Sequence, residues 1–273
     1  MENRRLIDEA KASALAGKIL DRERIIALLN IDPETEEGEL LGQAAREVAS
    51  VVCKDRAYLW AAIGLDYRAC PMDCGFCSLG ASWGFVQDEV EYSDEEVIAQ
   101  VRKFAGDGVR WIVLRTTQFY DLYKLIALAQ KIKKAVPGEY ELGVNVGEFD
   151  EEIAQRMVEA GLEFVYHSVR LGEGRDTKFD PRERMATLNA VKNSPLKLVY
   201  LVEPIGVEHS NEEMADCFLT AMKYNAVVTG GMERVPVKGT PLGDFPALPE
   251  RRLAQIVAVT RLAAGFHAPD ICV

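Results

Sequence analysis

The residues with the clearest capacity for chemistry are three cysteines that fall within eight positions of one another. They occur in the segment Cys70-Pro-Met-Asp-Cys74-Gly-Phe-Cys77. Three thiolates on one short loop can bind a soft metal centre. A structural zinc site normally has a fourth cysteine or histidine nearby, and the histidines of the chain all lie far from this segment, at His167, His209 and His267. A [4Fe–4S] cluster bound by three cysteines is the other possibility, and it would leave one iron open to a substrate or cofactor.

The cysteine segment follows the first strand of a repeating strand and helix pattern. From Ala57 onward, short apolar runs alternate with amphipathic stretches of about 12–16 residues, which is typical of βα units. The predicted strands are Tyr58–Leu65, Trp111–Arg115, Tyr140–Val146, Phe164–Ser168, Leu198–Glu203, Ala226–Met232 and Asp270–Val273. The predicted helices between them are Asp94–Ala105, Leu122–Val136, Asp150–Ala160, Arg182–Lys192, Asn211–Lys223 and Pro249–Ala263.

This pattern predicts an α/β fold in which a parallel sheet forms a partial (β/α) barrel of about six βα units. A doubly wound open sheet is the alternative, but no Gly-x-Gly-x-x-Gly segment follows the first strand. The chain ends where a seventh strand begins, so either the barrel is incomplete or the polypeptide is truncated. Chemistry in such barrels occurs at the carboxyl ends of the strands, which is where the cysteine segment lies.

Two parts of the chain are predicted, a helical extension over residues 1–56 and a barrel domain over residues 57–273. In the first part, apolar residues recur at helical spacing. These stretches are Leu6–Leu20, Ile25–Leu29 and Leu40–Val52. No repeat, low-complexity segment or linker indicates a further domain.

Composition excludes several classes of protein. Acidic residues number 43 and basic residues 32, which gives a net charge of −11 and argues against nucleic acid as the main partner. No apolar run approaches the roughly 18–20 residues that span a bilayer, so no membrane association is expected. The segment Met1–Arg5 is charged and no apolar signal region follows it. A cytoplasmic location, where thiols stay reduced, is therefore expected.

The spacing Cys-x3-Cys-x2-Cys, with aromatic Phe76 just before the third cysteine, resembles the signature of the radical S-adenosylmethionine (SAM) superfamily. The resemblance implies a partial or full βα barrel with the cluster loop after its first strand. It also implies that the open iron of a [4Fe–4S] cluster binds SAM through its amino and carboxylate groups. One electron from the cluster would then cleave SAM to a 5′-deoxyadenosyl radical that abstracts hydrogen from a substrate. A low-potential electron donor, ferredoxin or flavodoxin, is implied as a partner.

From Ala57 to Val273 the chain is similar to the group that contains biotin synthase, the [FeFe]-hydrogenase maturase and methylornithine synthase. Cys70-Pro-Met-Asp-Cys74 resembles a Cys-Pro-x-Asp-Cys segment of biotin synthase, and Lys238-Gly-Thr-Pro-Leu242 resembles a segment that closes the sixth unit of that family. Biotin synthase also has a [2Fe–2S] cluster, its sulfur donor, held by three cysteines and an arginine. The aligned positions lie near Leu114, Gly143 and Leu201, and none is cysteine. Single-cluster relatives, which act on amino-acid-derived substrates, are therefore the better match.

The resemblance indicates four residues for SAM binding. Phe76 would lie near the adenine, and Arg170 and Arg184 would offer planar guanidinium groups to the carboxylate. Thr116 ends the second strand, where many radical SAM enzymes have Gly-Gly-Glu for the SAM amino group, so hydroxyl or amide contacts would substitute. The alternatives are a core aromatic for Phe76, solvated charges for both arginines and a capped turn at Thr116.

Charged residues at the carboxyl ends of later strands are candidates for substrate binding. Glu203 ends the fifth strand, and Glu233 and Arg234 end the sixth. Together they would suit a substrate that carries both charges, as an amino acid does, whereas solvated rim charges are the alternative. No catalytic acid, base or hydrogen donor is identifiable from the sequence.

The sequence thus predicts a radical SAM enzyme that acts on a small, amino-acid-derived molecule. Biotin synthase-type sulfur insertion is one alternative, and an iron–sulfur or zinc protein without turnover is another. The remaining cysteines, Cys53, Cys217 and Cys272, are expected to be structural, because unpaired cysteine is often simply buried.

Overall fold

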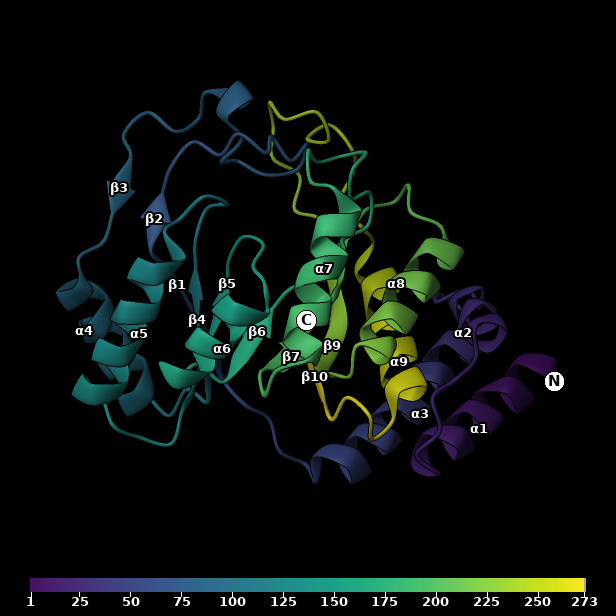
Figure 1. The fold of residues 1–273 in the computed structure, drawn as a ribbon. Coiled ribbons are helices and arrows are strands. Elements are labelled where there is room, and N and C mark those ends of the chain that lie inside the picture. The colour runs from purple at the N-terminus through teal and green to yellow at the C-terminus, as the bar shows by residue number, and fades with distance from the viewer. Residues whose placement is uncertain (273) are drawn as a thin grey trace.

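A curved parallel sheet forms the centre of the computed structural model, which describes residues 1–272 (Figure 1). Its strand order is β1-β4-β5-β6-β7-β9-β10, and each neighbouring pair is parallel. The strands are β1 (Trp60–Gly64), β4 (Trp111–Arg115), β5 (Glu141–Asn145), β6 (Phe164–Tyr166), β7 (Lys197–Val199), β8 (Val202–Ile205), β9 (Ala226–Glu233) and β10 (Asp270–Cys272). Strands β7 and β8 are two successive pieces of the single strand predicted over Leu198–Glu203, and both pair with β9.

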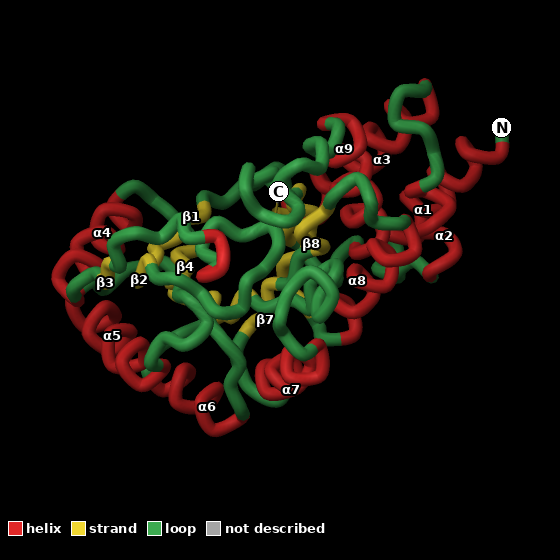
Figure 2. Tube along the Cα trace, turned by 90° about the horizontal axis from the view of Figure 1, so that it is seen from above, coloured by secondary structure: helices red, strands yellow, loops and turns green. Residues whose placement is uncertain are grey.

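Helices follow the strands and lie on the convex side of the sheet, as the view along the strands shows (Figure 2). They are α4 (Asp94–Gly106), α5 (Leu122–Ala135), α6 (Glu151–Glu159), α7 (Pro181–Lys192), α8 (Asn211–Lys223) and α9 (Glu250–Ala264). Capping boxes fix the starts of α4 and α8, where Ser93 and Ser210 pair with Glu96 and Glu213. A short antiparallel pair, β2 (Asp66–Tyr67) and β3 (Val90–Glu91), and one 3₁₀ turn (Ala81–Trp83) lie between β1 and α4.

Three N-terminal helices lie beside α9 at one end of the curved sheet (Figure 1). They are α1 (Glu2–Leu15), α2 (Arg22–Leu29) and α3 (Glu36–Cys53). Asp21 and Thr35 cap the starts of α2 and α3 by accepting backbone N–H groups. The buried side chains of these helices belong to the same apolar core as the outer face of the sheet, so the extension and the barrel share one hydrophobic interior.

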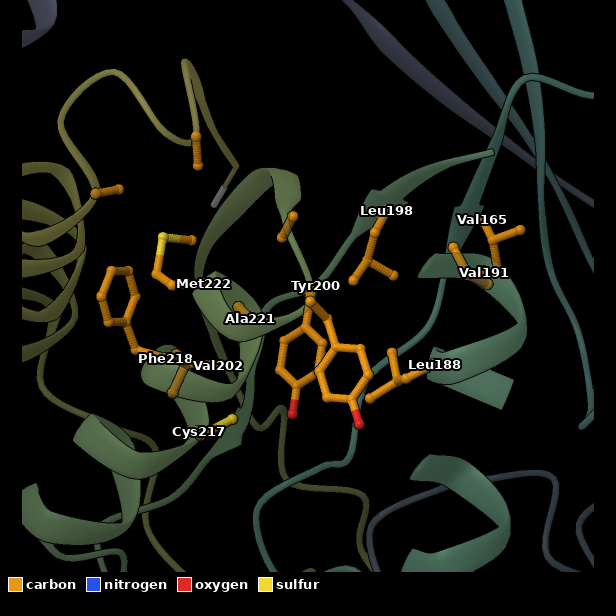
Figure 3. Packing of buried hydrophobic residues seen from close by; sticks show 14 of the residues in the cluster. Val165, Leu188, Val191, Leu198, Tyr200, Val202, Cys217, Phe218, Ala221 and Met222 are labelled. Atoms are coloured by element: carbon orange, nitrogen blue, oxygen red, sulfur yellow. The ribbon is translucent and has the colours of Figure 1, made fainter. Parts of the chain in front are cut away.

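Alternate residues of each strand face opposite sides of the sheet. Even-numbered residues such as Ile112 and Leu114 of β4 join the outer core beneath the helices. Figure 3 shows part of this layer, in which Tyr200 lies between Leu188 of α7 and Phe218 of α8. Trp111 and Val113 of β4 instead belong to a second cluster inside the barrel.

The predicted partial (β/α) barrel is confirmed. The doubly wound alternative is wrong, because α4 to α8 all lie on the same outer side of the sheet (Figure 2). Edge strands β1 and β10 do not pair with each other within residues 1–272, so the sheet is a half-barrel. Residue 273, the last of the predicted strand Asp270–Val273, lies outside the described residues. None of the helices described is both long and apolar enough to cross a membrane.

Candidate cofactor site at the mouth of the half-barrel

The cysteine loop, residues 70–77, lies beyond β1 and β2 at the end of the barrel where the strands terminate. Two other loops fasten its middle. Gly75 N–H donates to the backbone oxygen of Asp176, in the loop after β6, at 2.8 Å. The backbone oxygen of Gly75 accepts from Leu242 N–H, in the segment after β9, also at 2.8 Å. The loop is therefore anchored over the strand ends by segments that are distant in the sequence.

The three thiols of this loop differ in burial. Cys74 is buried, and Cys70 and Cys77 are half-buried. Burial raises the pKa of the Cys74 thiol to about 11, and the nearby Arg170 guanidinium opposes that shift. Across residues 1–272, no three acidic, cysteine or histidine side chains form a ready site for a single metal ion. This does not count against a cubane, in which each cysteine binds a different iron atom, and three soft thiols on one anchored loop fit such a cluster.

Arg170 and Phe76, both predicted to contact SAM, come together beside Cys74. Nη1 of Arg170 lies 3.9 Å from Cys74 Sγ. The guanidinium carbon lies 5.7 Å from the centre of the Phe76 ring and 4.7 Å from that of Phe179. Glu173 accepts from Nε at 2.9 Å and from Nη2 at 2.8 Å. Arg170 is thus a fixed, largely enclosed cation next to the cysteine loop, not a solvated loop charge.

Arg184 lies on α7 but is buried, with only 6% of its surface exposed. Its Nε and Nη2 donate to the backbone oxygen of Ser168 at 3.1 and 2.7 Å, and Nη1 donates to Glu148 at 3.1 Å. Its Nε also lies 3.4 Å from the Glu173 carboxylate. The solvated alternative for this helix arginine is therefore wrong, and the side chain lies in the same charged cluster as Arg170.

Two adjacent threonines in the loop after β4 differ in their hydrogen bonding. Thr117 donates to Asp66 from its backbone N–H at 2.8 Å and from its hydroxyl. Thr116 has a buried hydroxyl oxygen with no hydrogen-bond partner among the described residues. The capped turn therefore belongs to Thr117, whereas the Thr116 hydroxyl is available to a bound molecule.

Glu203 faces the barrel interior, where it accepts a hydrogen bond from the Tyr166 hydroxyl. Burial raises the pKa of Glu203, and the hydrogen bond from Tyr166 and the charge of Arg170 partly oppose the shift. Asn145 and Arg115 extend this chain of hydrogen bonds across the neighbouring strands. Asn145 Nδ2 donates to the backbone oxygen of Tyr166 at 2.9 Å, and Arg115 Nε donates to Asn145 Oδ1 at 3.3 Å.

Sequence reasoning missed three of these residues, Arg115, Asn145 and Tyr166. A signal was present, because each is the last residue of its strand. Two-residue alternation from the buried aromatic Phe164 would also have assigned Tyr166 to the interior.

The other two predicted substrate residues are not brought to Glu203. Arg234 is buried, pairs with the Glu208 carboxylate through both terminal nitrogens, and lies 5.2 Å from the centre of the Phe245 ring. Glu233 lines a different cavity of about 840 Å³, which lies between α3, α9, β1 and β10. The lining of that cavity includes no residue of the cysteine loop.

The chain is similar to known proteins in sequence and in fold. The biotin synthase of Heliobacterium modesticaldum is 22% identical over 276 residues, covering 94% of this chain and 80% of that relative. The structure of methylornithine synthase (PylB) superposes with a TM-score of 0.80 and 18% identity, covering 94% of this chain and 77% of that one. HydG, a maturase of the [FeFe]-hydrogenase, gives a TM-score of 0.80 at 14% identity, covering 97% of this chain and 61% of that one. The structural likenesses show a shared fold.

A family match covers the barrel directly. Residues 65–225, more than half of the 273-residue chain, match the radical SAM superfamily. The match includes the cysteine loop, both buried arginines of the charged cluster and Glu203. The chain therefore belongs to the radical SAM superfamily, whose enzymes use a [4Fe–4S] cluster and S-adenosylmethionine.

Proposed function

We propose that Cys70, Cys74 and Cys77 bind a [4Fe–4S] cluster and that SAM binds beside it at the mouth of the half-barrel. The observation that carries this proposal is the three-thiol loop anchored over the strand ends, with the Arg170 guanidinium 3.9 Å from a cysteine sulfur. When bound, the cluster and SAM together supply a 5′-deoxyadenosyl radical that removes a hydrogen atom from the substrate. The protein positions the reactants and excludes water.

The SAM-binding side chains follow from the charged cluster. Arg170 directs Nη1, which contacts no carboxylate of residues 1–272, toward Cys74 of the cysteine loop, where it can meet the SAM carboxylate. Arg184, whose nitrogens bond to Ser168 and Glu148, adds a fixed positive charge beside it. Phe76 offers a ring face to the adenine, and the unpartnered hydroxyl of Thr116 offers a hydrogen bond to the polar end of SAM.

The substrate in this proposal is a small, amino-acid-derived molecule that enters the barrel interior and meets Glu203. A low-potential donor such as ferredoxin or flavodoxin supplies the electron. The thiols of the loop must stay reduced to bind iron, which supports a cytoplasmic location.

Anaerobic reconstitution with iron and sulfide tests the proposal. Dithionite-reduced protein should release 5′-deoxyadenosine and methionine from SAM. A protein that binds iron or zinc without turnover would release neither, and that result would contradict the proposal. Zinc in place of iron, or no metal at all after anaerobic purification, would contradict it as well.

Counting iron separates this function from sulfur insertion. One cubane gives about four irons per chain, and an added [2Fe–2S] centre about six. Four is the expected value, since none of the positions aligned with the second-cluster cysteines is a cysteine. Two of them are buried leucines, and the third is a glycine with no room for a side chain. Leu114 and Leu201 are buried, and a Cβ at Gly143 would lie 2.4 Å from the Phe164 ring.

A further inference from the structure

Four polar side chains form a continuous row across the inner wall of the half-barrel. We call Arg115, Asn145, Tyr166 and Glu203 the polar row. Arg115, Asn145 and Tyr166 are the last residues of neighbouring strands β4, β5 and β6, and Glu203 belongs to β8. Hydrogen bonds connect Arg115 to Asn145 and Asn145 to the backbone of Tyr166, whose hydroxyl donates to Glu203.

The row faces the interior, not the helices. Val113 and Phe164, two residues before Arg115 and Tyr166, both belong to the interior cluster. The intervening residues Leu114 and Val165 belong to the outer core. Strand alternation therefore directs Arg115 and Tyr166 into the barrel.

The row also adjoins the cysteine loop. The charge of Arg170, whose Nη1 lies 3.9 Å from Cys74 Sγ, acts on Glu203. Arg115 acts on Glu203 and on Tyr166 in the same way. These couplings place the row within electrostatic reach of the proposed cofactor site.

Each end of the row has one charge without a counter-charge. Across residues 1–272, no carboxylate lies within 4.0 Å of the guanidinium of the exposed Arg115, whose only side-chain hydrogen bond goes to neutral Asn145. No cation of the described chain lies within that range of Glu203, whose hydrogen bond comes from a phenol. The two other interior arginines differ, since Arg170 and Arg184 both contact carboxylates. Arg115 is exposed at the mouth of the half-barrel and Glu203 is half-buried, so a ligand that enters from solvent can reach both charged groups.

We propose that the polar row determines substrate specificity, with Arg115 binding the carboxylate and Glu203, supported by Tyr166, binding the amino group of a free α-amino acid. The inference rests on the proposed function and assigns the two charges of the substrate to named residues. It moves the cationic role from Arg234, whose guanidinium is committed to Glu208, to Arg115. Asn145 positions Arg115 by accepting from its Nε.

The test uses the reconstituted holoenzyme with SAM present under anaerobic conditions. Binding of the twenty common L-α-amino acids and of L-ornithine is measured by isothermal titration calorimetry, alongside release of 5′-deoxyadenosine. At least one amino acid should bind and stimulate release. Its analogues lacking only the amino group or only the carboxylate should bind tenfold or more weakly, because each loses a charged hydrogen bond.

Variants assign each charge to its residue. In Glu203→Gln, removing the amino group from the ligand should no longer lower its affinity, whereas removing the carboxylate should still lower it. Arg115→Met should show the opposite selectivity, and Tyr166→Phe should weaken discrimination at the amino group only. Glu141→Gln is the matched control, because Glu141 pairs with Arg110 and Lys197 at the other end of the barrel, and it should leave both discriminations intact.

The outcomes are distinct. No binding by any amino acid, with SAM cleavage intact, would overturn the inference and leave the proposed function standing. Equal loss of affinity for ligand and both analogues in every variant would overturn it too, since that is a structural effect. If the variants lose iron or fail to fold, the comparison of analogues on the wild-type enzyme still decides, and equal binding of all three would refute the proposal. Wild-type enzyme that binds no cluster or cleaves no SAM would refute the proposed function itself.

Discussion

The two ends of the barrel interior are built from the same strands and differ in almost every physical respect. At the amino ends, Trp60 and Trp111 stack with ring centres 5.0 Å apart and planes 1° from parallel. Phe164 packs edge-on against Trp111 at 4.9 Å. At the carboxyl ends, the polar row and the charged cluster of Arg170 and Arg184 occupy the equivalent wall.

The difference shows how one fold separates stability from chemistry. We call the amino ends of the strands the floor of the barrel. The aromatic side chains there exclude water, and their burial and ring contacts stabilise the folded state. At the mouth, Arg115 is exposed without a counter-charge among residues 1–272, and the buried Thr116 hydroxyl has no partner among the described residues. Both groups can hydrogen-bond to a ligand. Substitutions at the floor should therefore change stability, and substitutions at the mouth should change binding and turnover.

The largest effect is expected for Cys74→Ala at the mouth. Loss of one of three thiolate ligands should abolish SAM cleavage and greatly lower the iron content after reconstitution, as measured by iron analysis and 5′-deoxyadenosine release. Cys53→Ser is the control, because Cys53 lines the cavity between α3 and α9, whose lining includes no residue of the cysteine loop. A Cys74→Ala protein that keeps its full iron content and activity would show that the loop is not the cluster site.

Phe164→Ala tests the floor. Removing a fully buried aromatic should lower the free energy of unfolding by about 3–5 kcal/mol, as measured by urea denaturation. Tyr166→Phe, two residues further along the same strand, should cost only about 1 kcal/mol, because it loses one hydrogen bond. Similar losses for both substitutions would remove the distinction between floor and mouth.

Arg184→Lys should weaken SAM binding roughly tenfold without loss of charge, because lysine cannot make the several hydrogen bonds to Ser168 and Glu148 that hold this positive charge in place. Equilibrium dialysis with labelled SAM measures this effect. Arg182→Lys is a matched control two residues earlier on α7, where the side chain is 91% exposed. Equal affinity in the two variants would place SAM away from Arg184.

The smallest effect concerns pH. Because burial raises the pKa of Glu203 above its ordinary value of 4.5, the folded protein retains a proton that the unfolded chain releases just above that pH. Stability in this window falls as pH rises. Glu203→Gln removes this titration, so its free energy of unfolding should decline less than that of the wild type between about pH 4.5 and neutrality. Parallel stability curves for the two proteins would show that Glu203 is not perturbed.

The positions of strands, helices and the cysteine loop could be predicted from sequence because they depend on local information. Two-residue and helical periodicities mark βα units within a few residues, and the cysteine spacing is contained in one loop. The break of the fifth strand into β7 and β8 was not predicted. The register between β7 and β9 shifts at Leu198 and Val199, and such an irregularity depends on the partner strand.

The roles of charged residues were predictable only in part. Arg170 and Arg184 were recognised by resemblance, but burial of the Arg184 side chain depends on Ser168 and Glu148, which reach it through the fold. The sequence indicates Arg234 as the cation for the substrate, but the structure pairs Arg234 with Glu208. Arg115 was not identified from the sequence.

By itself, therefore, the sequence determined the half-barrel and the three-thiol loop, because both depend on spacing between near neighbours. The tertiary structure alone decided which charges are neutralised and which remain for a ligand. Tyr166 and Glu203 are separated by 37 residues, and Arg115 and Asn145 by 30. These contacts depend on how the strands are arranged in the sheet, and whether a charge has a partner there depends on that arrangement.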